Sequence, residues 1–192
     1  MALNDNQVKF VKGDYVVYPA HGVGQIDGVE TQKIGGMEVE LYSISFEKDR
    51  MRLKVPTFKV KDAGLRKISS TGQMDSAMET LKGKSKVRRI MWSRRAAEYE
   101  TKINSGDPVA IAEVLRDLKR SNDETEQSYS ERQIYESALG RLAREVAALE
   151  TISEEAAAER LEDVMGVYKP SLEDLSDTSS DNEDDEDEAM AA

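Results

Sequence analysis

The stretch GGMEVELYSISFEKDRMRLKVP, residues 35–56, decides the fold of the N-terminal part of this chain. Its two leading glycines can supply the positive φ angles that a tight hairpin turn needs. Along MEVELYSISF the side chains alternate, with Leu41 on one side and Tyr42 and Ile44 on the other. The charged turn EKDR follows, and then a short strand that ends at Pro56. This alternation predicts antiparallel strands.

The residues before this stretch also favour strands. DYVVYP, residues 14–19, is rich in β-branched and aromatic side chains and is stopped by Pro19. HGVGQIDGVETQKI, residues 21–34, begins with a glycine-rich turn. Several short strands at close spacing predict a small, strongly bent sheet or barrel.

From about Thr71 onward the hydrophobic period changes to that of helices. MDSAMETLKG predicts a short helix that stops at Gly83, and the segment around Trp92 predicts a second one that runs to Ile103. Three further helices follow, and their apolar positions predict a common core. These positions are Ile111, Val114, Leu115, Leu118, Tyr135, Ala138, Leu139, Leu142, Val146, Leu149, Leu161, Val164 and Met165.

Capping residues mark where several of these helices begin. Ser93 can cap the helix of the tryptophan segment, and Asp107 can cap the next one, with a proline at its first position. Ser130 and Gln133 have the spacing of a capping box, and Ser153 can cap the last helix. The sequence therefore predicts an all-helical domain after the strands.

The negative charge of the chain is concentrated at its C-terminal end. The formal net charge is −11 over 192 residues, and residues 171–192 carry ten acids and no base. Subtracting these ten charges leaves −1 for residues 1–170, so the body of the protein is close to neutral. A run of this kind buries too little apolar surface to offset its ordering entropy. We therefore expect an acidic, disordered tail over residues 170–192.

Several function classes find no support in the composition. The chain has no cysteine, and it has no apolar run near the ~18–20 residues that a membrane span needs. Its N-terminus lacks the apolar stretch of a signal peptide, so we expect a cytoplasmic protein. The only histidine, His21, lies in the turn PAHGVG, where we expect a turn residue and not a catalytic base. No cluster has zinc spacing, and we expect neither an enzyme nor a cofactor.

The segment VRRIMWSRRAAEY, residues 87–99, holds the only tryptophan of the chain within its densest block of positive charge. Between Lys82 and Arg95 there are seven basic residues and no acid. In one interpretation Trp92 anchors a helix core, because apolar residues follow it at helical spacing, and the arginines are solvated. In the other, guanidinium groups bind phosphate oxygens while the indole wedges against bases. The candidate residues for DNA binding are Trp92, Arg94, Arg95, Arg88 and Arg89.

Such a patch is unable to find a DNA site by itself. Phosphate contacts without base readout commonly give dissociation constants of about 10⁻⁴–10⁻⁶ M. The sequence has no recognition helix with side chains aimed at a groove. A second module must deliver the patch, and the strand-rich module is the candidate.

Six blocks in order along the chain resemble the CarD/CdnL family of bacterial transcription regulators, over about residues 8–165. They are KGDYVVYPAHGVGQI, MRLKVP, GLRKI (Gly64–Ile68), WSRR (Trp92–Arg95), INSGD (Ile103–Asp107) and IAEVLRDL (Ile111–Leu118). The first part also resembles the polymerase-interacting domain of the transcription-repair coupling factor. The resemblance implies an α+β protein: a Tudor-like β-barrel module over residues 1–66, a helical DNA-contacting domain over 67–169, and the acidic tail.

The resemblance also implies a mechanism. The N-terminal module would bind the β subunit of RNA polymerase, and the helical domain would touch promoter DNA at the upstream edge of the bubble. The tryptophan would enter the minor groove there without sequence specificity and stabilise the open complex. Family contacts map onto Trp92, Arg94 and Arg95 for DNA, with Arg88 and Arg89 as our addition from charge. For polymerase they map onto Gln32, Ile34, Lys54 and Pro56.

This chain departs from the family at two of these places, and other interpretations stay open. Some members have arginine where Gln32 stands, and a further family base falls at Ala97. Ile34 and Pro56 are equally compatible with plain edge-strand roles. The alternative functions are a stand-alone, nucleoid-associated DNA-architectural protein and a purely protein-binding adaptor. We expect a monomer whose acidic tail aids solubility or, in a second hypothesis, folds back and competes with DNA.

Overall fold

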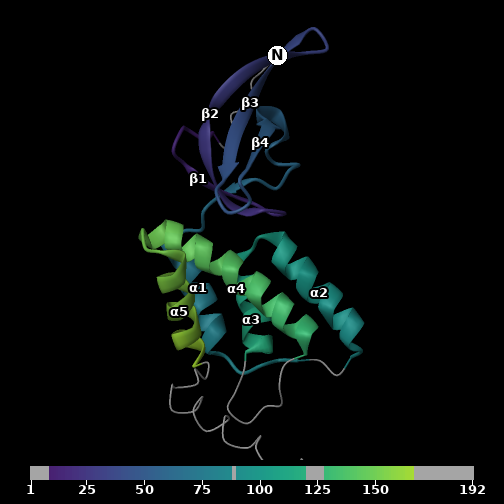
Figure 1. Ribbon diagram of the computed structural model, residues 1–192, viewed down its shortest axis with the longest axis vertical. Coiled ribbons are helices and arrows are strands. Elements are labelled where there is room, and N and C mark those ends of the chain that lie inside the picture. Colours follow the sequence, from purple (N-terminus) through teal and green to yellow (C-terminus); the bar gives the residue numbers. More distant parts are fainter. Residues whose placement is uncertain (1–8, 88–89, 120–127, 167–192) are drawn as a thin grey trace, which may run out of the picture.

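The computed structural model describes residues 9–87, 90–119 and 128–166, and within them a small sheet stands on a bundle of helices (Figure 1). The predictions made for Arg88, Arg89 and the acidic segment 170–192 lie outside the described residues. We refer to the five strands as the β module and to the five α-helices as the helical bundle.

The β module is one antiparallel sheet with the strand order β4-β3-β2-β1-β5. Its elements are β1 (Tyr15–Tyr18), β2 (Gly22–Ile34), β3 (Met37–Phe46), β4 (Met51–Pro56), a 3-10 helix η1 (Thr57–Lys59) and β5 (Arg66–Lys67). The sheet is open within the described residues; the strand pattern predicted a bent sheet or a barrel, and the family resemblance implied a barrel. The reason lies in β5, which is only two residues long and pairs with β1 alone. The strand-rich module itself is confirmed and is compatible with a Tudor-like fold.

A long hairpin of β2 and β3 dominates the sheet. Its turn is the predicted glycine pair, with φ of 61° at Gly35 and 85° at Gly36, conformations that residues with a side chain rarely adopt. Ile34 and Met37 face each other across this turn, which fixes the register of both strands. One face of the sheet covers an apolar core. Its buried members are Phe10, Val16, Ile26, Tyr42, Ile44, Phe46, Val55, Val60 and Leu65.

The helical bundle contains the predicted number of helices within the described residues. They are α1 (Thr71–Lys82), α2 (Trp92–Ser105), α3 (Pro108–Leu118), α4 (Tyr129–Glu150) and α5 (Glu154–Met165). The predicted stripe of α3 is buried throughout, and Ala138, Leu142 and Val146 of α4 join it in one core. This core is separate from that of the β module.

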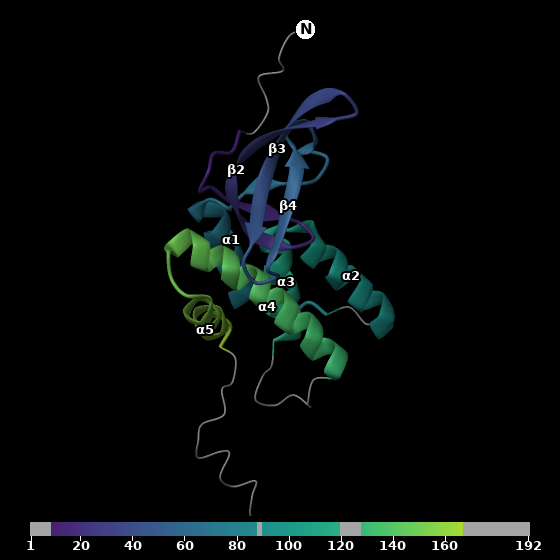
Figure 2. The same ribbon diagram turned by 45° about the horizontal axis from the view of Figure 1, so that its top comes forward.

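The predicted caps are partly correct. The side chains of Asp107 and Ser153 accept hydrogen bonds from the first turns of α3 and α5, as expected. The capping box of α4 is formed by Ser128 and Glu131, so the assignment to Ser130 and Gln133 was wrong. The segment contains two overlapping boxes, and the helix begins at the earlier one. The start of α4 lies beside the start of α2, at the end of the bundle away from the sheet (Figures 1 and 2).

Candidate functional site

The strand register brings the four residues predicted to bind polymerase onto one face of the sheet. Lys54 pairs with Ser43, and Pro56 pairs with Leu41 of the same strand. On the other side of β3, Gln32 pairs with Val39, and Ile34 follows two residues further along the hairpin. Residues paired across antiparallel strands share a face, and residues two apart along a strand do so too. These four side chains therefore lie on the face opposite to the one that carries Tyr42 and Ile44.

The outer part of this sheet face carries both apolar and charged groups that reach solvent, whereas Leu41 and Ser43 on the same face are buried. Gln32 and Lys54 are exposed, Ile34 is 52% exposed, and Pro56 is half-buried at the end of β4. The Lys54 ammonium lies 2.6 Å from a carboxylate oxygen of Glu30, in a pair whose side chains are both nearly half exposed. Such a pair contributes little to stability. The Lys54 ammonium and the Glu30 carboxylate are instead available to form hydrogen bonds with a partner protein.

Sequence reasoning missed Met37 at this face. It is the cross-strand partner of Ile34 and is 70% exposed. The two side chains form an apolar pair at the tip of the hairpin, beyond the buried core. The alternation of β3 contained the signal, because Met37 has the same parity as Val39 and Leu41.

Trp92 is the first residue of α2, at an outer corner of the bundle. The N-cap is Met91, whose carbonyl accepts hydrogen bonds from the Arg94 and Arg95 amides at 3.1 Å each, so the predicted cap at Ser93 was wrong. The indole is half-buried and packs against the core that contains Tyr99. The two interpretations of Trp92 are therefore compatible, because one side of the ring packs on the bundle while part of it stays accessible.

Arg95 is tied to this corner by two contacts. Its guanidinium lies 5.0 Å from the Trp92 ring centroid, a cation–π distance. Its Nη2 is also 3.2 Å from a carboxylate oxygen of Glu131, in the first turn of α4. The side chain is only 20% exposed. The Glu131 carboxylate therefore competes with a phosphate for the Arg95 guanidinium.

The remaining groups around Trp92 are more accessible. Arg94 is exposed, and its guanidinium forms no hydrogen bond or ion pair within the described residues. Met91 is 79% exposed and Tyr129, the first residue of α4, is 75% exposed, and sequence reasoning missed both. We name Met91, Trp92, Arg94, Arg95 and Tyr129 the Trp92 corner.

The basic linker between α1 and α2 is fastened to the end of α3. The Lys86 amide donates to Asp117 Oδ1 at 2.9 Å, and Lys119 Nζ donates to the Gly83 carbonyl at 3.2 Å. Because these bonds hold the backbone, the exposed side chains of Lys84 and Lys86 extend the positive surface toward the corner. A surface of guanidinium and ammonium groups around an indole suits a polyanion that offers flat rings.

His21 sits in the turn between β1 and β2, where the sequence placed it. Its ring stacks on Tyr18 at a centroid distance of 5.6 Å, and its Nδ1 is 3.7 Å from Asp49. No group of three or more side chains suited to a metal ion occurs in the described part of the chain. Among the helices described, none is long and apolar enough to span a bilayer.

Comparisons with known proteins match both modules. A family model described as the CarD-like/TRCF RID domain matches residues 10–69, and one described as the C-terminal domain of CarD matches residues 76–162. YdeB of Bacillus subtilis (strain 168), provisionally named a transcription factor, is 28% identical over 145 residues, covering 76% of this chain and 95% of its own. The solved structure of CdnLNt from Myxococcus xanthus is 35% identical and covers 35% of this chain and 96% of its own, with a TM-score of 0.29.

Proposed function

Because this chain belongs to the CarD/CdnL family, a family of transcription regulators that interact with RNA polymerase, we propose that it stabilises the promoter open complex. In this proposal the sheet face with Gln32, Ile34, Lys54 and Pro56 binds the β subunit. The Trp92 corner then contacts the upstream edge of the melted DNA, without sequence specificity. The protein acts as a monomer that bridges polymerase and promoter.

The observation that carries this proposal is the half-buried indole at an exposed corner of the bundle. A fully buried Trp92 would be a core residue and unable to touch DNA. The partly accessible ring is held by its packed side, so it needs little ordering when it meets a base or a groove wall. The exposed Arg94 beside it supplies a phosphate contact, and the family membership of the N-terminal part supplies the route to polymerase.

The test is the lifetime of the open complex on a linear promoter, with wild-type protein and with Trp92→Ala. A stacking or groove contact is typically worth about 1–3 kcal/mol, so the variant should shorten the stimulated lifetime by roughly tenfold. Its affinity for polymerase should stay at the wild-type value, because the sheet face is unchanged. Trp92→Phe retains a ring and serves as the control for lost packing.

An unchanged lifetime with Trp92→Ala would contradict the proposal and favour a purely protein-binding adaptor. The other candidate is a stand-alone DNA-architectural protein, favoured by the positive surface around Trp92. Such a protein would bind duplex DNA firmly without polymerase, with a salt slope near −0.9 for each phosphate neutralised. The proposed regulator should bind free DNA weakly and depend on polymerase for delivery.

A further inference from the structure

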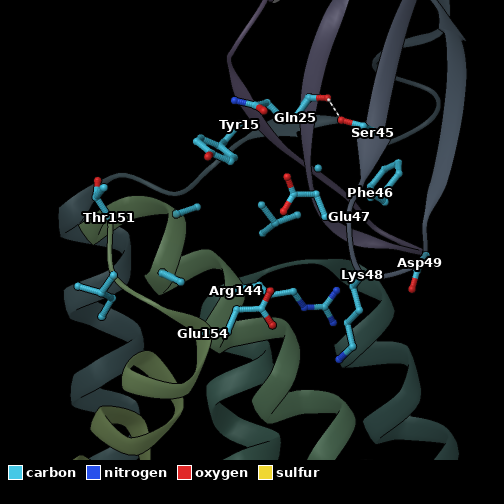
Figure 3. A pocket seen from close by; sticks show the side chains of 15 residues that line it. Tyr15, Gln25, Ser45, Phe46, Glu47, Lys48, Asp49, Arg144, Thr151 and Glu154 are labelled. Atoms are coloured by element: carbon cyan, nitrogen blue, oxygen red, sulfur yellow. Dashed lines mark hydrogen bonds between the residues drawn. The ribbon is translucent and has the colours of Figure 1, made fainter.

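The β module and the helical bundle have separate apolar cores. Their relative orientation is therefore not fixed by one common core. β2 packs beside α4, and a cavity of about 340 Å³ opens between them. Tyr15 and Phe46 line it from the sheet, while Arg144 and Thr151 line it from the helices (Figure 3). Close packing resists rotation, and a cavity at the joint weakens that resistance. Polar contacts must therefore supply much of the rigidity.

The first of these contacts is a part-buried ion pair between Arg66 of β5 and Glu145 of α4. Arg66 Nη1 and Nη2 lie 2.7 and 2.9 Å from the two carboxylate oxygens, which is a bidentate arrangement. Glu145 is only 2% exposed, and it also accepts a 2.7 Å hydrogen bond from the Ser69 amide. The Nε and Nη2 of Arg66 both donate to the carbonyl of Gly106, at the turn between α2 and α3. One side chain of the β module thus holds two elements of the bundle.

The second contact runs in the opposite direction, from the bundle to the sheet. Arg141 of α4 donates to the carbonyl of Pro19 and, at 2.8 Å, to that of Ala20, both in the turn after β1. It also reaches Asn104 near the end of α2. Burial lowers the pKa of Arg141, in agreement with a guanidinium enclosed at the joint. The two arginines form a reciprocal pair of ties between the modules.

This joint explains two sequence blocks that the proposed binding surfaces leave without a role. GLRKI supplies Arg66, and INSGD supplies Gly106. Gly106 ends α2 with a φ of 70°, a conformation that residues with a side chain rarely adopt, and it lies beside Val17 and Pro19 of the β module. Gly106 therefore meets a conformational requirement, and its carbonyl accepts the hydrogen bonds from Arg66.

We propose that Arg66 and Arg141 are positioning residues that fix the spacing between the sheet face and the Trp92 corner. This inference rests on the proposed function, because a fixed spacing matters only if both surfaces engage one polymerase–promoter complex. A rigid joint delivers the indole to one place beside the bound polymerase. A loose joint keeps each surface able to bind alone but spreads the position of the indole, which lowers the effective concentration at the DNA.

The test uses two variants of the full chain. Arg66→Gln/Glu145→Gln removes both charges together, because removing Arg66 alone would leave a buried carboxylate without its counter-ion. Arg141→Gln removes the second tie. The matched control is Arg160→Gln, which breaks the Arg160–Glu150 ion pair between α5 and α4 and leaves both ties intact. Since the chain has no cysteine, Lys33→Cys and Ala97→Cys can carry a fluorescent pair that reports the distance between the modules.

We expect a narrow distance distribution in the wild type and in Arg160→Gln, and a broadened one in both joint variants. The stimulated open-complex lifetime should fall by about tenfold in the joint variants, because a spread position lowers the effective concentration of the indole at the DNA. Their affinities for polymerase alone and for free DNA should match the wild type. That combination is specific to lost positioning, because a damaged surface or an unfolded module would lower one of the two affinities.

Two results would overturn the inference. One is a distance distribution that stays narrow in both joint variants. The other is an open-complex lifetime equal to that of the wild type although the distance distribution is broadened. A loss of either affinity would likewise reject a pure positioning role. Failure of the proposed function looks different, because then the wild-type protein itself would fail to lengthen the lifetime. The wild type must therefore be measured beside the variants in every assay.

Discussion

The sheet face and the Trp92 corner are built in different ways. The sheet face combines residues from three strands, and the hydrogen-bonded ladder holds Gln32 and Lys54 in register although they are far apart in sequence. The corner combines a short segment at the start of α2 with Tyr129 at the start of α4. A face made by a ladder is preformed, as a surface that docks on a folded protein should be. The corner depends on side chains at helix starts, where Trp92 is held by its packed side and Arg94 reaches solvent.

The ion pairs of the two surfaces differ in how far their side chains are exposed to solvent. The Lys54–Glu30 pair is nearly half exposed on both sides, and a partner can reach both groups without breaking it. The Arg95–Glu131 pair is closer to being buried, and Arg95 also stacks on Trp92. Arg95 at the corner is therefore partly occupied by contacts within the protein, whereas Lys54 on the sheet face is directly accessible to a partner.

Charge reversal on the sheet face should give the largest effect. Lys54→Glu puts a second acid beside Glu30 and removes a donor from the proposed polymerase contact. We expect polymerase affinity to fall by at least about thirtyfold, as for the loss of one partner of an interfacial charge pair. Co-migration or anisotropy with core polymerase measures it, with Lys61→Glu on the same module as the control. Equal losses in the two variants would show a general charge effect and would remove Lys54 from the interface.

Removal of the exposed guanidinium at the corner should give the next effect. Arg94→Gln should weaken binding to free duplex DNA by about three- to tenfold and reduce the salt slope by about 0.9, the value for one phosphate. Polymerase affinity should not change, which would separate the two surfaces. Titrations at several salt concentrations measure both quantities, with Arg160→Gln as a distant arginine control. A slope equal to that of the wild type would mean that Arg94 touches no phosphate.

Release of Arg95 from its intramolecular partner should give a smaller effect, of opposite sign. Glu131 uses one oxygen for Arg95 and the other for the Ser128 amide in the capping box. Glu131→Gln keeps the cap, since glutamine serves at that position, but removes the charge. We expect DNA affinity to rise by about two- to fivefold, the equivalent of a weak surface pair. Glu136→Gln on the same helix is the control. Unchanged or weaker DNA binding by Glu131→Gln would contradict the idea that Glu131 competes with a phosphate for Arg95.

Local signals in the sequence predicted much of the fold. The glycine pair of the hairpin, the Asp107 cap and the buried stripe of α3 depend only on neighbouring residues, and all three are confirmed. The cap of α4 was wrong because Ser128–Glu131 and Ser130–Gln133 are both good local boxes. A tertiary contact separates them in the structure, because only Glu131 pairs with Arg95 of α2.

The candidate sites were predictable as sets of residues but not as geometry. The sequence identified Trp92 and Arg94, yet it had no means to pair Arg95 with Glu131, 36 positions away. The contacts between the two modules were even harder to predict from the sequence, because Arg66 and Glu145 are 79 positions apart and neither lies in an unusual local pattern. The strand pattern left a bent sheet or a barrel open for a related reason: closure depends on how far β5 extends, which alternation does not encode.

The smallest effect concerns the contact between α2 and α3, where Lys102 in the last turn of α2 pairs with Glu113 of α3 at 2.7 Å. The hydrogen bond from Lys102 is the main cause that lowers the pKa of Glu113 below its ordinary value of 4.5. Because this pKa is lowered in the folded state, the pair stabilises the fold above pH 4.5 and loses its contribution as the pH falls through the folded pKa.

Lys102→Gln should therefore reduce the free energy of unfolding at neutral pH by no more than about 1 kcal/mol, since both side chains are more than a third exposed. The difference from the wild type should shrink as the pH is lowered into the acid range, where Glu113 is protonated in both proteins. Urea unfolding at a series of pH values measures it, and Lys102→Gln/Glu113→Gln should show no such pH dependence relative to Glu113→Gln. A difference that is constant with pH would mean that Lys102 stabilises the contact between α2 and α3 through the packing of its aliphatic chain and not through its charge.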